Sequence, residues 1–212
     1  MTATGGAPAL QIDLPPGFTG MPVTDDDTMN ARLAWGISEK VAPQAGRSVE
    51  DFAAALMALT PGLREKGVRV FGKFAAGDGP EYLATLSLGV LRWPAADTEM
   101  LALRRFAVAD ALLDVYKREQ PRADARLVRL PIGPAMAAVH AGEFHVPREF
   151  TGRPTEIVRV QAKVEYRIPL PSGEHVAILA VTAESEAAWP AVAEAASRVA
   201  HSLRTADPEN RP

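Results

Sequence analysis

The chain has 212 residues, a formal net charge of −3 and no cysteine. Without cysteine it cannot form disulfides or Cys-ligated zinc and iron–sulfur sites. Its slightly acidic balance disfavours nucleic-acid binding, because that class of protein is usually strongly basic. The opening MTATGGAPAL lacks the basic start and apolar run of a signal peptide, and no apolar stretch approaches the about 20 residues of a membrane span. We therefore expect a cytoplasmic protein that does not enter a membrane.

The N-terminal part of the chain predicts a short strand followed by a helical hairpin. We expect residues 1–8 to be a disordered tail, and 10–14 to form a strand that ends at Pro15-Pro16-Gly17. Apolar residues then recur at helical spacing in two stripes, one for each helix. The stripes are Met29, Leu33, Ile37 and Val41, then Phe52, Leu56, Leu59 and Leu63. Pro61 lies inside the second stripe and predicts a helix end or kink near Thr60.

The rest of the chain predicts six strands and two helices. Two strand-like runs flank the turn AGDGP, which is typical of a β-hairpin. In chain order the elements are strands 68–75 and 81–93, helix 97–119, strands 125–131, 134–144, 157–168 and 175–183, and helix 186–204. Hairpins outnumber β-α-β units, so we expect an α+β fold with a mainly antiparallel sheet of six or seven strands and packed helices. We assign 9–204 to a single domain and 205–212 to a second disordered tail.

The strand at 157–168 alternates between polar and apolar residues along its length. Its polar row is Arg159, Gln161, Lys163, Glu165 and Arg167, whereas the opposite face is apolar from Val158 to Ile168. Such alternation predicts one face against the core and one in water. The next strand, 175–183, is apolar at nearly every position, so we expect it inside the sheet and its alternating partner nearer an edge or a wet patch. The polar row is either a solvated face or a surface that binds a protein partner.

No group of residues has the spacing of a catalytic or metal site. Ser172, Glu174 and His175 lie in a tight turn, and no G-x-S-x-G motif presents a nucleophile. His140 and His145 are five apart and point to opposite faces of a strand, which leaves only Glu143 with His145 as possible metal ligands. We therefore predict neither catalytic residues nor a metal.

Three further clusters have a structural interpretation that outweighs a functional one. The acids Asp25 to Asp27 precede a helix, where carboxylates are favoured as caps. The glycine clusters lack the spacing of a phosphate-binding loop, so no cofactor is expected. The densest basic run has no interleaved aromatic residues for base stacking, and nucleic-acid binding through it is the weaker alternative to a solvated surface. That run consists of Lys117, Arg118, Arg122, Arg126 and Arg129.

The C-terminal half resembles a widespread actinobacterial family. The motif YRIPLPSG at 166–173, an apolar strand and a final helix ending in HSLR form the closing part of the resemblance. LPPGF at 14–18 and VRLPIGPAMAAVH at 128–140 are similar to the family's opening and middle. The architecture is similar to the PsbP-like group, which includes the yeast Ran-release factor and mycobacterial lipoproteins. The resemblance implies an α/β/α sandwich that binds partners without catalytic residues, and an accessory role near type VII secretion.

Two functions follow as expectations. The first is a non-catalytic protein-binding or accessory module that uses the polar row for an unknown protein partner. The alternative is a small-molecule-binding protein or enzyme with a cleft between the helical hairpin and the sheet. The alternative requires a pocket of ~300 Å³ or more with convergent polar groups. The sequence identifies neither the partner nor the oligomeric state.

Overall fold

The computed structural model describes residues 8–43, 46–79, 82–93, 104–146, 157–183 and 185–205. Seven strands form its main sheet: β2 (Thr19–Pro22), β3 (Val68–Ala75), β4 (Leu83–Arg92), β5 (Asp124–Leu130), β6 (Gly133–Val146), β7 (Ile157–Pro169) and β8 (His175–Ala183). They are ordered β2-β3-β4-β8-β7-β6-β5, and every neighbouring pair is antiparallel. The predicted α+β fold with an antiparallel sheet of six or seven strands is confirmed. The assignment of one domain over 9–204 stays a prediction.

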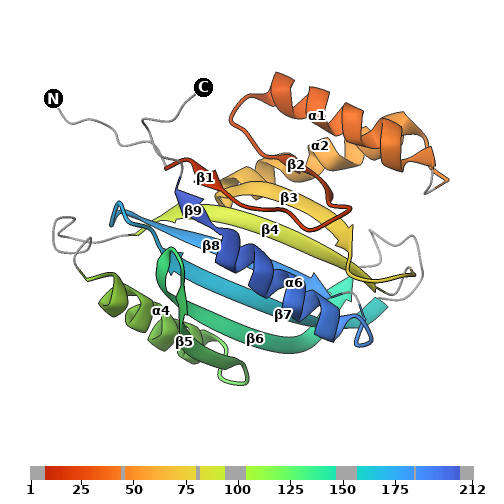
Figure 1. The fold of residues 1–212 in the computed structure, drawn as a ribbon. Helices are drawn as coiled ribbons and strands as arrows, with labels where there is room; N and C mark the ends of the chain where they lie inside the picture. The colour runs from red at the N-terminus through yellow and green to blue at the C-terminus, as the bar shows by residue number, and fades with distance from the viewer. Residues whose placement is uncertain are drawn as a thin grey trace, which may run out of the picture.

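Helices lie on both faces of this sheet (Figure 1). The helices are α1 (Asp27–Val41), α2 (Val49–Glu65), α4 (Arg105–Glu119) and α6 (Trp189–Ser202). On one face, α6 buries Val192 and Val199 in a core with Leu179 of β8. On the other face, α4 buries Leu112 and Tyr116 in a separate cluster with strand residues that include Ala138. Among the described residues, no helix has both the length and the apolar character that a membrane span needs.

The α1–α2 hairpin packs on the same face as α4, at the opposite end of the sheet. Register partners on neighbouring strands share a face, so the row Met21, Phe71, Ser87, Ala180, Glu165 and Ala138 lies on one side of the sheet. Ala138 contacts the α4 cluster at one end of this row, whereas α1 and α2 contact β2 and β3 at the other end. Helices cover both ends of this face.

The strand order shows where the two strands of the alternating hairpin lie in the sheet. As predicted, β8 lies inside the sheet, between β4 and β7. Its alternating partner was predicted nearer an edge or a wet patch: β7 lies between β8 and β6, one position closer than β8 to the edge strand β5, but it is not itself an edge strand. The polar row of β7 is therefore not the sign of an edge. It has a different physical reason, which involves α4 and is described below.

The two ends of the described chain meet in a small second sheet. Strands β1 (Leu10–Gln11) and β9 (Arg204–Thr205) pair antiparallel, and Arg204 forms an ion pair of 3.2 Å with Asp13. Thr205 was predicted to belong to a disordered tail, and this is wrong. The last helix ends at Ser202, whose hydroxyl accepts a hydrogen bond from the Asp13 N–H at 2.9 Å. The tails at 1–7 and 206–212 lie outside the described residues.

Several predicted boundaries change in the structure. The first strand stops at Gln11, and β2 was not predicted because its sequence TGMP contains both glycine and proline. The predicted helix 97–119 is confirmed from Arg105 onward, and its first turns lie outside the described residues, as do 147–156. A helix end near Thr60 is wrong, because α2 continues to Glu65 with Pro61 inside it, whereas a kink there stays a prediction. Arg64 in the last turn bonds Asp27 of α1 at 2.8 Å, which holds this turn in place.

Candidate functional site

A pocket of about 590 Å³ lies between the α1–α2 hairpin and the edge of the main sheet. Its helical wall consists of Ile37, Val41, Phe52, Ala55, Leu56 and Leu59. Its sheet wall comes from β2, β3 and the start of β4, with Met21, Phe71, Phe74, Ala75 and Leu83 among its apolar residues. Pockets of this size and apolar character are typical of small-molecule sites. The predicted cleft between hairpin and sheet is therefore present.

Most residues of the helical wall belong to the two apolar stripes predicted from the sequence. Ile37 and Val41 belong to the predicted stripe of α1, and Phe52, Leu56 and Leu59 to that of α2. The most buried residues of α1 are instead Asn30, Ala34 and Ser38, on a different side of the helix. Leu59 remains 51% exposed. The apolar stripes thus border a cavity instead of closing into a solid core.

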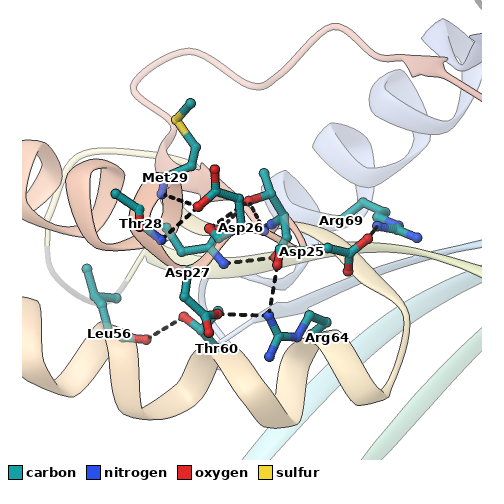
Figure 2. Close-up of polar contacts among 11 residues, drawn as sticks. Asp25, Asp26, Asp27, Thr28, Met29, Leu56, Thr60, Arg64 and Arg69 are labelled. Atoms are coloured by element: carbon teal, nitrogen blue, oxygen red, sulfur yellow. Dashed lines mark hydrogen bonds and ion pairs between the residues drawn. The ribbon is translucent and has the colours of Figure 1, made fainter.

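Polar contacts fix the hairpin at the end where α1 begins and α2 ends (Figure 2). Asp26 caps α1, and its carboxylate accepts hydrogen bonds from the N–H groups of Thr28 at 2.8 Å and Met29 at 3.0 Å. Asp27 bonds Arg64 of α2, and Asp25 lies 3.8 Å from Arg69 of β3. The capping prediction for this acidic triplet is confirmed at Asp26. The other two carboxylates bind separate arginines.

Few polar groups reach the pocket, and those with charge are cationic. Among the described lining residues, only Arg47, Lys73 and Thr19 have polar side chains, and none is acidic. Arg47 lies in the loop between α1 and α2, and Lys73 lies on β3 as the register partner of Thr19. None of these three residues was predicted as a site residue from the sequence. No local pattern marked them, since the pocket joins segments that are distant in the chain.

The polar row of β7 forms an internal ion network beneath α4. Glu165 is only 6% exposed, and its carboxylate accepts hydrogen bonds from Lys163 at 2.7 Å and Arg167 at 2.8 Å. The Arg167 guanidinium also lies 4.7 Å from the Tyr116 ring centre and 3.7 Å from Glu119, both on α4. The expectation that this face meets water is wrong at Glu165, because α4 covers it.

Two other members of the row are less buried than Glu165. Gln161 and Lys163 are half-buried, and the Arg159 side chain lies outside the described residues. Binding of a protein partner through Arg159, Gln161, Lys163, Glu165 and Arg167 stays a prediction.

Burial and charge shift the pKa values of two groups in this network. Burial alone would raise the pKa of Glu165, but Lys163 and Arg167 outweigh it and hold this pKa below its ordinary value. Burial, reinforced by the charge of Glu165, raises the pKa of Tyr116 to about 12. The Tyr116 hydroxyl is buried and has no hydrogen-bond partner among the residues that the structure describes. Glu165 therefore stays ionised at neutral pH, whereas Tyr116 stays neutral.

We expect Tyr116→Phe to leave the stability unchanged or to raise it by up to about 1 kcal/mol, because the hydroxyl it removes is desolvated and unpaired. The ring that stacks with Arg167 is retained. Tyr166→Phe is the matched control, since Ser197 opposes the rise that burial causes in the pKa of the Tyr166 hydroxyl, and loss of this interaction should cost about 1 kcal/mol. Urea denaturation of both variants measures the difference. A larger loss for Tyr116→Phe than for Tyr166→Phe would contradict this interpretation.

The other candidate groups from the sequence do not converge on a site. Ser172 is exposed in the turn before β8, whereas His175 is buried at the start of that strand. His140 lies on β6 opposite Lys163, and the side chains of Glu143 and His145 lie outside the described residues. Within the described ranges, no three His, Cys, Asp or Glu side chains gather in a way that could hold a metal ion.

The basic run is divided between three elements. Lys117 and Arg118 lie in the last turn of α4, Arg122 lies in the following turn, and Arg126 and Arg129 lie on β5. The last two line a smaller cavity of about 190 Å³ between the β5–β6 edge and α6. No continuous basic surface follows from these positions.

Comparison with known proteins adds no family to these observations. No protein-family model matches the chain, and a search of curated proteins also finds no match. The pocket and its residues are therefore the basis for inferring a function.

Proposed function

We propose that this protein binds a small, largely apolar molecule in the pocket between the α1–α2 hairpin and β2–β3. One observation carries the proposal: the apolar stripes of both helices border a cavity of about 590 Å³ instead of a closed core. A ligand that removes half-exposed leucine and phenylalanine side chains from water lowers the free energy of the complex. The gain in stability is about 25 cal/mol per Å² of apolar surface buried.

The arrangement of the walls also supports binding in place of simple loose packing. The Asp27–Arg64 pair joins α1 to α2, and Asp25, just before α1, lies 3.8 Å from Arg69 of β3, so both contacts link the hairpin at one end. The edge of the sheet supplies the opposite wall through Phe71. A preformed apolar pocket avoids part of the ordering cost of binding.

Titration with the neutral apolar dye Nile red tests the proposal. We expect saturable binding to the unmodified protein, detected as a rise in dye fluorescence. In Ala55→Trp an indole occupies part of the pocket, and the apparent Kd should rise by about tenfold or more, the equivalent of about 1.4 kcal/mol. Ala55 is exposed, so the substitution should leave the fold intact, which circular dichroism checks.

Ala54→Trp provides the matched control. Ala54 is also exposed and is adjacent on the same helix, but it does not line the pocket. This variant should bind the dye as the unmodified protein does. The proposal is wrong if the dye does not bind, or if the two tryptophan variants weaken binding equally.

A further inference from the structure

We infer that this protein has a second site, separate from the apolar pocket, that binds a small zwitterion such as an amino acid. The site is the cavity of about 190 Å³ between α6 and the β5–β6 edge of the main sheet. Pockets for drug-sized ligands have about 300–1,000 Å³, so this cavity suits a smaller molecule. The inference goes beyond the proposed function, because it concerns another cavity and another class of ligand.

The strand register places the cavity on the face of the sheet that α6 covers. Arg126, Ala137 and Tyr166 are register partners on β5, β6 and β7, and all three line the cavity. The same row continues to Leu179 of β8, which packs in the core with α6. The neighbouring row, with Ala138, faces α4 on the side of the sheet where the α1–α2 hairpin also packs. The sheet therefore separates this cavity from the apolar pocket.

Two opposite charges line the cavity without pairing with each other. Asp124 and Arg126 are two residues apart on β5, so their side chains leave the same face of the strand about 7 Å apart along it. Both are exposed, and neither forms an ion pair with another described residue. A ligand with an ammonium and a carboxylate group can therefore bind both side chains without breaking an ion pair of the described chain.

Further hydrogen-bond donors lie on the Arg126 side of the cavity. Arg129 lines it from the same strand, and Tyr166 and Ser197 contribute hydroxyl groups. Burial raises the pKa of Tyr166, whereas Ser197 and the charge of Arg126 oppose this rise, so both groups lie near the Tyr166 hydroxyl. Tyr166 keeps its proton at neutral pH and can donate it to an anion. These donors suit a carboxylate, because hydrogen bonds to an ionised group are stronger than neutral ones.

The contact between His201 and Ser197 supports a binding site in place of a nucleophile. The Nδ1 atom of His201 lies 2.8 Å from the Ser197 carbonyl oxygen and 3.5 Å from the Ser197 hydroxyl oxygen. A carbonyl oxygen only accepts hydrogen bonds, so Nδ1 carries a hydrogen and donates it there. This atom therefore cannot take the proton of the Ser197 hydroxyl, which stays a neutral group that can bind a ligand.

Isothermal titration with leucine and two analogues tests the inference. The analogue 4-methylpentanoate lacks the ammonium group of leucine, and 3-methylbutylamine lacks its carboxylate. All three share the same apolar part, so the comparison isolates the two charges. We expect leucine to bind about tenfold or more tightly than either analogue, because it alone makes charge-assisted bonds at both ends of the site.

Variants of β5 test which side chain binds which charge. Asp124→Asn should raise the Kd of leucine by about tenfold or more and leave that of 4-methylpentanoate within about twofold. Arg126→Gln should weaken both of these ligands. The matched controls are Asp114→Asn and Arg122→Gln, which remove the same charges from exposed positions that do not line the cavity. Both controls should bind leucine as the unmodified protein does.

Ala55→Trp separates this inference from the proposed function. It should weaken Nile red binding and leave the Kd of leucine unchanged, since Ala55 lines only the apolar pocket. The inference is overturned, and the proposed function stands, if leucine binds no more tightly than both analogues or if Asp124→Asn and Asp114→Asn weaken it equally. Loss of leucine binding in Ala55→Trp would place leucine in the apolar pocket and would also overturn the inference.

Discussion

Glu165→Ala should lower the free energy of unfolding by about 3 kcal/mol, the lower end of the cost of removing one partner from a buried ion pair. Glu165 is 6% exposed and accepts hydrogen bonds from Lys163 and Arg167. Its removal leaves two cations beneath α4 without their shared anion. The lower end applies because the Lys163 side chain is 35% exposed and can turn toward water.

The matched control is Glu194→Ala, on the outer side of α6. Glu194 and Arg198 are 2.7 Å apart, the same separation as Lys163 and Glu165, but both side chains are largely exposed. Exposed pairs contribute about 0–1 kcal/mol, so this variant should differ little from the unmodified protein. Urea denaturation of both variants compares the two costs. Equal losses would contradict the role assigned to burial.

The same network gives a pH dependence with a definite sign. Because the pKa of Glu165 is lower in the folded protein than its ordinary 4.5, ionised Glu165 stabilises the fold above that value. This contribution is lost as the pH falls through the folded-state pKa. Glu165→Gln should therefore be less stable than the unmodified protein at pH 7, and the difference should shrink at about pH 3.5. A constant difference would indicate that ionisation of Glu165 does not stabilise the fold.

The sequence predicted which elements form and where their apolar faces lie, but it could not predict what covers each face. Alternation in β7 identified its two faces, yet Glu165 is buried because α4, some fifty residues earlier, packs over it. Alternation only separates polar from apolar side chains. Lys163 and Arg167 neutralise Glu165 on its own strand, which lets a polar row lie under a helix.

The sequence predicted where a pocket could lie, between the helical hairpin and the sheet, but not all of the residues that line it. Helical spacing selected Ile37, Phe52 and Leu56 correctly as one apolar surface. Whether that surface closes on the sheet depends on where the hairpin is held, and the Arg64–Asp27 and Arg69–Asp25 pairs that hold it join residues far apart in sequence. Strand β2, which supplies part of the opposite wall, has no strand-like pattern of its own.

Gly72→Ala should lower the free energy of unfolding by about 2 kcal/mol, within the range for forcing an extra carbon into a filled site. Gly72 of β3 is the register partner of Gly20 of β2. A β-carbon at Gly72 would lie 2.5 Å from the Gly20 Cα and 2.5 Å from the tip of the Phe18 ring. The ring can move, but the Gly20 backbone is held in the strand pair. β2 must therefore shift at the edge that forms the sheet wall of the pocket.

Gly36→Ala in α1 provides a control of opposite sign, because a β-carbon there meets nothing within 4 Å. Alanine is favoured over glycine inside a helix, so this variant should gain about 0.5–1 kcal/mol. Urea denaturation distinguishes the two glycines directly. Adding Phe18→Ala to Gly72→Ala removes only the contact with the ring, and the double variant should not recover the stability of Phe18→Ala alone. Full recovery would mean that the ring, and not the close approach of the two backbones, requires glycine at this position.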